Sequence, residues 1–124
     1  PILPDKNKDG EHRIEGIGDS FIPKIVDLQA LSPVLRVNDS DAINIARQIN
    51  KLGLSVGISS GANVFGAILK ANESQETINI ATILCDDNKK YLSTDLCSPK
   101  EESLSRKIKI LNYELIQWRS SSPT

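Results

Sequence analysis

The stretch NDSDAINIARQINKLGLSVGISSGANVFGAIL, residues 38–69, decides the fold. Its first half starts with Asn38, a good helix cap, followed by acidic residues that suit the positive end of a helix dipole. Gly53 then supplies a typical helix stop. Between the two, apolar side chains recur at helical spacing on one face, so we predict a helix with an inner face of Ala42, Ile43, Ala46, Ile49 and Leu52.

The second half of the stretch predicts a strand followed by a helix. Leu54–Ile58 is a short apolar run typical of a buried strand, and Ser59-Ser60-Gly61-Ala62 opens a second helix. The apolar residues of this helix predict that it packs against a sheet: Val64, Phe65, Ile68 and Leu69. Two further strands are predicted at Val34–Val37 and Ile78–Cys85. The order strand–helix–strand–helix–strand indicates an α/β fold with parallel pairing.

The length of 124 residues fits one domain at most. Three short strands make a thin sheet, so the pattern predicts that this chain is part of a larger one. We divide the sequence into a polar loop over residues 1–13, the α/β portion over residues 14–96 and a tail over residues 97–124. Within the tail, the apolar run 108–118 is compatible with either a strand or a helix.

The charge balance excludes several classes of partner. Lys and Arg number 15 against 16 Asp and Glu, a net charge of −1 that lacks the basic footprint of a nucleic-acid binder. No stretch approaches the roughly 20 apolar residues of a membrane span. The sequence also shows no basic and apolar leader, so we expect a cytoplasmic protein with reduced thiols.

No metal site is predicted. Cys85, Cys97 and the single His12 are too few for a structural zinc site. Residues 5–10 match only the first half of a calcium-binding loop, because Gly16 stands where a bidentate Glu is required. Cys85 is expected to be a small core residue that closes an apolar run.

Ligands of open α/β sheets bind beyond the carboxyl ends of the strands. Ser59-Ser60-Gly61, Cys85-Asp86-Asp87 and Gly16–Asp19 are the candidates for that edge. By residue type alone, the hydroxyls of Ser59 and Ser60 are expected to cap the helix rather than to meet a ligand. A serine-hydrolase triad is not predicted, since His12 lies in the polar loop.

Three motifs, in this order and spacing, resemble the C-terminal third of cysteine synthase (O-acetylserine sulfhydrylase): IEGIGDSFIP at residues 14–23, GISSGAN at 57–63 and KYLSTDL at 90–96. The resemblance covers residues 11–96. It implies a three-layer α/β/α architecture, part of the large cofactor domain of a tryptophan-synthase-β-like fold. The implied cofactor is pyridoxal 5'-phosphate, and the implied partners are a small amino-acid substrate and a second copy of the enzyme.

The resemblance also implies roles for individual residues. Ser59 would bind the pyridine nitrogen of the cofactor, and Gly16, Ile17 and Gly18 would border the substrate pocket. The implied reaction is replacement of the acetate of O-acetyl-L-serine by sulfide, which gives L-cysteine through an aminoacrylate intermediate. A cystathionine β-synthase-like activity is an alternative within the same family.

Two departures from the family pattern affect this interpretation. Asp19 stands where the synthases often have a small residue, and a carboxylate there could act as the catalytic base for water, so that sulfide is released from cysteine and serine is formed. A local capping or pairing role for Asp19 is the alternative. Residues 85–90 (CDDNKK) also replace the Pro-Ser-Ser-Gly-Glu-Arg of many members.

Several parts of the family's active site have no counterpart in this sequence: the Schiff-base lysine, the loop for the substrate carboxylate and the glycine-rich phosphate loop. We therefore expect the 124-residue chain to be inactive alone and to need the missing N-terminal part of the enzyme. A non-catalytic structural or dimerisation fragment is the alternative from a different class.

Overall fold

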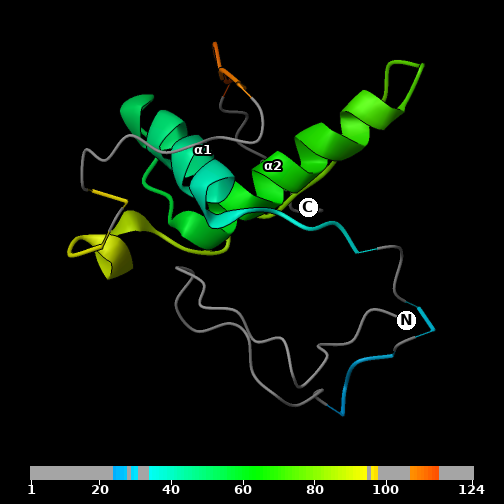
Figure 1. Cartoon of the computed structure of the whole chain (residues 1–124), viewed down its shortest axis with the longest axis horizontal. Coiled ribbons are helices and arrows are strands. Elements are labelled where there is room, and N and C mark those ends of the chain that lie inside the picture. Colours follow the sequence, from blue (N-terminus) through cyan, green and yellow to red (C-terminus); the bar gives the residue numbers. More distant parts are fainter. Residues whose placement is uncertain (1–23, 28, 31–33, 95, 98–106, 115–124) are drawn as a thin grey trace, which may run out of the picture.

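The computed structural model describes residues 24–27, 29–30, 34–94, 96–97 and 107–114. Its regular elements are α1 (Asp39–Lys51), α2 (Ile58–Glu73) and the short 3₁₀ helix η1 (Asn88–Tyr91). Figure 1 shows α1 packed across the first half of α2, with the chain after α2 returning along that helix to η1. The start of α2 and the approach to η1 therefore lie side by side.

Helix α1 confirms the sequence-based prediction closely. Asn38 occupies the N-cap position without a side-chain cap bond, and its carbonyl accepts the first helical hydrogen bond from the Ala42 amide at 3.1 Å. Gly53 follows the C-cap with a φ of 99°, the left-handed conformation that favours glycine at a helix end. The predicted inner face is buried apart from Leu52, and two further residues join it, Ile45 and Asp41.

The contact between α1 and α2 depends on Gly61. A Cβ atom at this position would lie 2.1 Å from the Ala42 carbonyl oxygen and 2.9 Å from the Ala46 amide nitrogen. One turn later, Phe65 is only 3% exposed and closes the same interface. The opening of the second helix is confirmed to within one residue, but the expected sheet is absent among the described residues, and α2 packs on α1 instead.

The three predicted strands are wrong for the part of the chain that the structure describes. Residues 34–37 and 78–85 are neither helix nor strand, and Ile58 is already the first residue of α2. A strand needs a neighbouring backbone, and Val56 finds a side chain instead. Its amide donates to Asn50 Oδ1 at 3.1 Å, and its carbonyl accepts from Asn50 Nδ2 at 2.8 Å. The three-layer α/β/α architecture is accordingly not confirmed by these residues.

The described part of the tail, residues 107–114, is neither helix nor strand. It is fastened to α1 by Gln48, which donates to the Ile108 carbonyl at 2.8 Å and accepts from the Ile110 amide at 2.7 Å. Tyr113 donates to the Leu52 carbonyl at 2.9 Å. Neither the strand nor the helix considered for this apolar run forms in residues 107–114. Hydrogen bonds to α1 and to Leu52 hold the segment instead.

The expected core position of Cys85 is wrong. Both cysteines are free thiols and exposed. The segment that carries Cys85 lies on the outside of α2, where Ile83 is 72% exposed and Leu84 46%. Among the described helices, none is long and apolar enough to cross a bilayer.

The crossing at Gly61 generates a stability prediction. Gly61→Ala should lower the free energy of unfolding by about 1–3 kcal/mol or more, because backbone atoms of α1 block the new methyl group. Gly66→Ala is the matched control, since its nearest neighbour is the Leu35 Cδ1 atom at 4.0 Å. The control should gain up to about 1 kcal/mol from helix propensity. Urea unfolding followed by circular dichroism measures both, and equal effects would contradict the close crossing.

Candidate functional site

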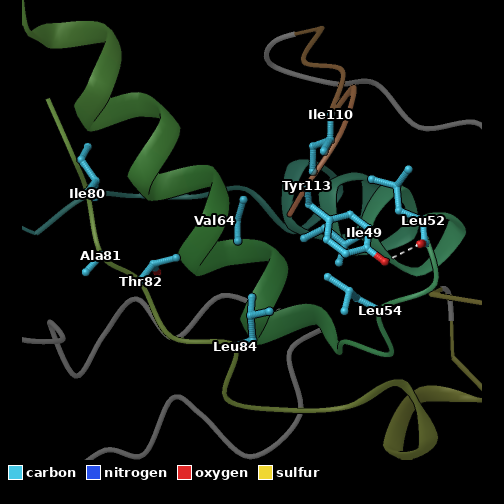
Figure 2. A pocket seen from close by; sticks show the side chains of 10 residues that line it. All are labelled: Ile49, Leu52, Leu54, Val64, Ile80, Ala81, Thr82, Leu84, Ile110 and Tyr113. Carbon is cyan, nitrogen blue, oxygen red and sulfur yellow. Dashed lines mark hydrogen bonds between the residues drawn. The ribbon is translucent and has the colours of Figure 1, made fainter. Parts of the chain in front are cut away.

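One candidate is an apolar groove of about 480 Å³ between the end of α1, α2 and the segments at residues 80–84 and 110–113. Figure 2 shows its lining: Ile49, Leu52, Leu54, Val64, Ile80, Ala81, Thr82, Leu84, Ile110 and Tyr113. The Tyr113 hydroxyl already bonds the Leu52 carbonyl. This lining offers apolar contact and contains no carboxylate, thiol or amine, so catalytic chemistry must be sought elsewhere.

A cluster of hydrogen bonds surrounds the Asp86 carboxylate at the start of α2. One carboxylate oxygen, Oδ2, accepts from the Ser59 amide at 3.0 Å and from the Tyr91 hydroxyl at 3.1 Å. The other, Oδ1, accepts from the Ser60 amide at 2.9 Å and from the Ser60 hydroxyl. We call Asp86, Ser60 and Tyr91 the Asp86 clamp. It supplies acceptors for helix N–H groups that have no partner within the helix itself.

Backbone contacts bring the Asp86 clamp this close to α2. The Gly57 amide donates to the Asp86 carbonyl at 3.1 Å, and the Ser60 hydroxyl contacts the same carbonyl at 3.2 Å. A Cβ atom on Gly57 would lie 2.4 Å from Asp86 Oδ2 and 2.5 Å from the Tyr91 ring. Glycine at position 57 is therefore required by close approach.

The environment of Asp86 favours its ionised form. Burial alone would raise the pKa of this carboxyl, but the hydrogen bonds from Ser60, Ser59 and Tyr91 outweigh burial. The pKa of Asp86 therefore lies below its ordinary value of 3.8. At neutral pH a carboxylate stands at the positive end of α2, where the helix dipole also favours it.

Ser59 differs from its neighbour Ser60 in what its hydroxyl does. Ser60 is fully buried and its hydroxyl is engaged with Asp86. Ser59 is half-buried, and its hydroxyl makes no hydrogen bond to any residue that the structure describes. The capping role that residue type favours for Ser59 is wrong, because α2 has Gly57 as its N-cap and no side-chain bond from it. Within the described part of the chain, the hydroxyls of these two adjacent serines therefore differ: that of Ser60 is engaged and that of Ser59 is not.

Curated relatives identify the protein family. The chain is 47% identical over 96 residues to cysteine synthase B of Campylobacter jejuni, a match that covers 77% of this chain and 31% of the relative. It is 41% identical over 100 residues to cysteine synthase A of Escherichia coli, with 76% and 31% covered. The chain belongs to the cysteine synthase family. It spans about a third of the length of these relatives. No family model matches the chain.

Two solved structures extend the comparison for this cysteine synthase family member. A hydrogen sulfide-producing enzyme from Fusobacterium nucleatum superimposes with a TM-score of 0.67 at 50% identity, covering 77% of this chain and 28% of that one. An aspartate-to-asparagine variant of a hydrogen sulfide-producing enzyme, in complex with an alpha-aminoacrylate intermediate, gives a TM-score of 0.70 at 48% identity, covering 77% and 29%.

The structure brings together two of the three stretches predicted to share a ligand-binding edge. Ser59-Ser60-Gly61 and Cys85-Asp86-Asp87 meet through Asp86, as expected for ends of adjacent segments. The third stretch, with Gly16, Ile17, Gly18 and the candidate catalytic Asp19, lies outside the described residues. Within the described part, no group of His, Cys, Asp and Glu could hold a metal ion.

Two members of this site, Gly57 and Tyr91, were not predicted from the sequence motifs. Both lie inside stretches that carry the cysteine synthase resemblance, residues 57–63 and 90–96. The signal was therefore present, but spacing along the chain does not show that the Tyr91 hydroxyl reaches back five residues to Asp86.

The lowered pKa of Asp86 predicts a particular pH dependence. A carboxyl whose pKa is lower in the folded state stabilises fully above its unfolded-state value, here 3.8, and this contribution is lost as the pH falls through the folded-state pKa. At pH 7, Asp86→Asn should lower the free energy of unfolding by about 0.5–2 kcal/mol, the usual cost of a lost helix cap.

The difference in the free energy of unfolding between the parent and Asp86→Asn should be constant from pH 5 to 8. It should shrink as the pH falls below 3.8 and through the lower pKa of Asp86 in the folded protein. Urea unfolding across this range measures it. Asp87→Asn serves as the control, because within the described residues the Asp87 carboxylate accepts only from the Lys89 amide in its own turn. A difference that grows as the pH falls would contradict the assignment.

Proposed function

We propose that this chain forms one side of the cofactor site of a pyridoxal-phosphate-dependent enzyme of the cysteine synthase type, which exchanges the substituent on the β-carbon of a small amino acid. The observation that carries the proposal is the Ser59 hydroxyl, half-buried at the start of α2 and without a partner among the described residues. Relatives named cysteine synthase at 34–47% identity support it.

The residues at this site fit a neutral contact to a heteroaromatic nitrogen. A hydroxyl can donate to or accept from such a nitrogen without forcing it to carry a proton, whereas a carboxylate would hold it protonated. The carboxylate of Asp86 is already occupied by four donors and cannot make this contact. The resemblance to the cysteine synthase family assigns it to the Ser59 hydroxyl. When bound, pyridoxal phosphate would supply an electron sink for bond cleavage at the substrate α- and β-carbons.

The proposal assigns the remaining parts of the site to other residues. Gly16, Ile17 and Gly18 would border the substrate, and the Schiff-base lysine and the phosphate loop would come from the two thirds of the family length that this chain does not span. We propose that the working enzyme includes that part in a tryptophan-synthase-β-like α/β/α fold, acts as a homodimer in the cytoplasm, and that the 124-residue chain alone is inactive.

Ser59→Ala in the complete enzyme tests the cofactor site. Loss of one neutral hydrogen bond contributes about 0.5–1.5 kcal/mol, so the Kd of the apoenzyme for pyridoxal phosphate should rise about three- to tenfold. Absorbance titration measures this Kd. Ser55→Ala is the control, since the Ser55 hydroxyl donates to Asn88 Oδ1 in an exposed contact. This variant should leave the Kd unchanged. Equal affinities of the parent and Ser59→Ala would contradict the assignment.

A second function, release of sulfide from cysteine with formation of serine, is favoured by Asp19 and by the solved neighbours. At 48–50% identity these neighbours are hydrogen sulfide-producing enzymes, and one carries an aspartate-to-asparagine change together with an alpha-aminoacrylate intermediate. In this reaction cysteine and water give serine and hydrogen sulfide. Asp19 would take a proton from water while the oxygen forms its bond to the substrate β-carbon.

Asp19→Asn in the complete enzyme tests this second function. Removal of a general base typically costs a factor of about 10² to 10⁴, so serine formation from cysteine should fall by at least about 100-fold. Cysteine formation from O-acetylserine and sulfide, which consumes no water, should fall far less. Product analysis by mass spectrometry measures both, with Asp27→Asn as an exposed control. Serine formation at the parent rate would leave Asp19 with only a local capping or pairing role.

The same product analysis distinguishes a cystathionine β-synthase-like activity from the two reactions above. A cystathionine β-synthase-like enzyme would join its substrate to a thiol-containing amino acid, so a thioether product from serine and such a thiol would identify it. A structural or dimerisation fragment would give none of these products in any background.

A further inference from the structure

We propose that Asp86 is a positioning residue for Ser59: by occupying the first amide groups of α2 together with Ser60 and Tyr91, it holds the Ser59 hydroxyl free and oriented for the cofactor. This inference rests on the proposed function of Ser59 and extends it to a residue that makes no contact with the cofactor itself.

At the start of α2, Asp86 takes the place of a serine cap. The opening amides of a helix lack partners within it, and a serine hydroxyl close by is the usual substitute. Gly57, the N-cap of α2, has no side chain to offer. Asp86 accepts from the amides of Ser59 and Ser60 at 3.0 and 2.9 Å. With these amides satisfied, the Ser59 hydroxyl is not needed by the helix.

The two adjacent serines of α2 make different contacts. The Ser60 hydroxyl contacts both Asp86 Oδ1 and the Asp86 carbonyl, and Ser60 is fully buried. The Asp86 amide in turn lies 3.3 Å from the same hydroxyl oxygen. Ser60 therefore belongs to the Asp86 clamp, whereas Ser59, half-buried beside it, presents a hydroxyl with no partner in the described part of the chain.

The backbone around Ser59 is held in place by buried and long-range contacts. Tyr91 is fully buried and donates to the same oxygen, Oδ2, that accepts from the Ser59 amide. A second set of hydrogen bonds joins η1 to the residues before α2. Asn88 donates to Asn50 Oδ1 at 3.1 Å, and the Asn50 side chain bonds both the amide and the carbonyl of Val56. Both sides of the Ser59 backbone are thus anchored to side chains from elsewhere in the chain, as orientation of a ligand-binding hydroxyl requires.

The test is a double-mutant cycle on cofactor affinity in the complete enzyme. Asp86→Asn keeps the size of the side chain but turns one acceptor into a donor, so the Kd for pyridoxal phosphate should rise about three- to tenfold, comparable to Ser59→Ala. In the Ser59→Ala background the same Asp86→Asn change should alter the Kd less than about twofold, because the hydroxyl to be positioned is gone. Tyr91→Phe should give a smaller rise.

Asp87→Asn is the matched control, one residue away, since its carboxylate accepts from Lys89 and touches no part of α2 among the described contacts. Hydrogen exchange of the Ser59 and Ser60 amides supplies a readout that does not involve the cofactor: both should exchange faster in Asp86→Asn and at the parent rate in Asp87→Asn.

The outcomes separate this inference from the proposed function. If Ser59→Ala raises the Kd and Asp86→Asn does not, the positioning role is overturned while the cofactor site stands. If the Asp86→Asn effect is the same with and without Ser59, Asp86 acts independently of Ser59 and the inference is again overturned. If Ser59→Ala leaves the Kd unchanged, the proposed function fails and the positioning role fails with it.

Discussion

The Asp86 carboxylate at the start of α2 is the interaction on which the rest of the described structure depends. It joins two segments that are 26 residues apart, through the amides of Ser59 and Ser60. The arrangement requires glycine at position 57, a buried hydroxyl at Ser60 and the Tyr91 ring. An acceptor with a negative charge is the right chemistry for this place, because helix amides and the helix dipole both attract it.

The Asp86 clamp and the crossing at Gly61 both depend on the short segment 57–61. Gly57 admits Asp86 and Tyr91, and Gly61, four residues later, admits the backbone of α1. Between them lie Ser59 and Ser60, which are held on one side by a carboxylate and on the other by close helix packing. The backbone that carries the Ser59 hydroxyl is therefore held from two directions, which gives the proposed cofactor contact a rigid base.

The exposed apolar residues after α2 explain why the predicted strands do not form. Ile78, Ile80, Ile83 and Leu84 are 38–72% exposed. Strands with such side chains are stable when neighbouring strands pair with their backbone and helices cover both faces of the sheet. This chain spans about a third of its relatives' length, so the partners of a parallel sheet are expected in the part that it does not span. The apolar run 78–85 predicts a buried strand, but the described residues leave its large side chains exposed.

The cysteine synthase resemblance could be read from three motifs because motif spacing is a property of the chain alone. Helix α1 was predictable to within a residue for a similar reason: its cap, its apolar face and its Gly53 stop are all local. The sequence also placed the Ser59 and Asp86 stretches together, at the edge of a sheet. The described residues form no sheet, and the two stretches meet through the Asp86 carboxylate instead.

By itself, the sequence determined the family, the two helices and the two stretches that meet at Ser59. The tertiary structure decided what each polar group does there. It assigned the helix-capping task to Asp86, engaged the Ser60 hydroxyl, gave the Ser59 hydroxyl no partner among the described residues and placed Cys85 outside the core. Those outcomes depend on distances between residues far apart in the chain. Hydrogen bonds are satisfied over a few ångströms, and residue type and spacing along the chain do not specify which of several competing partners lies within that range.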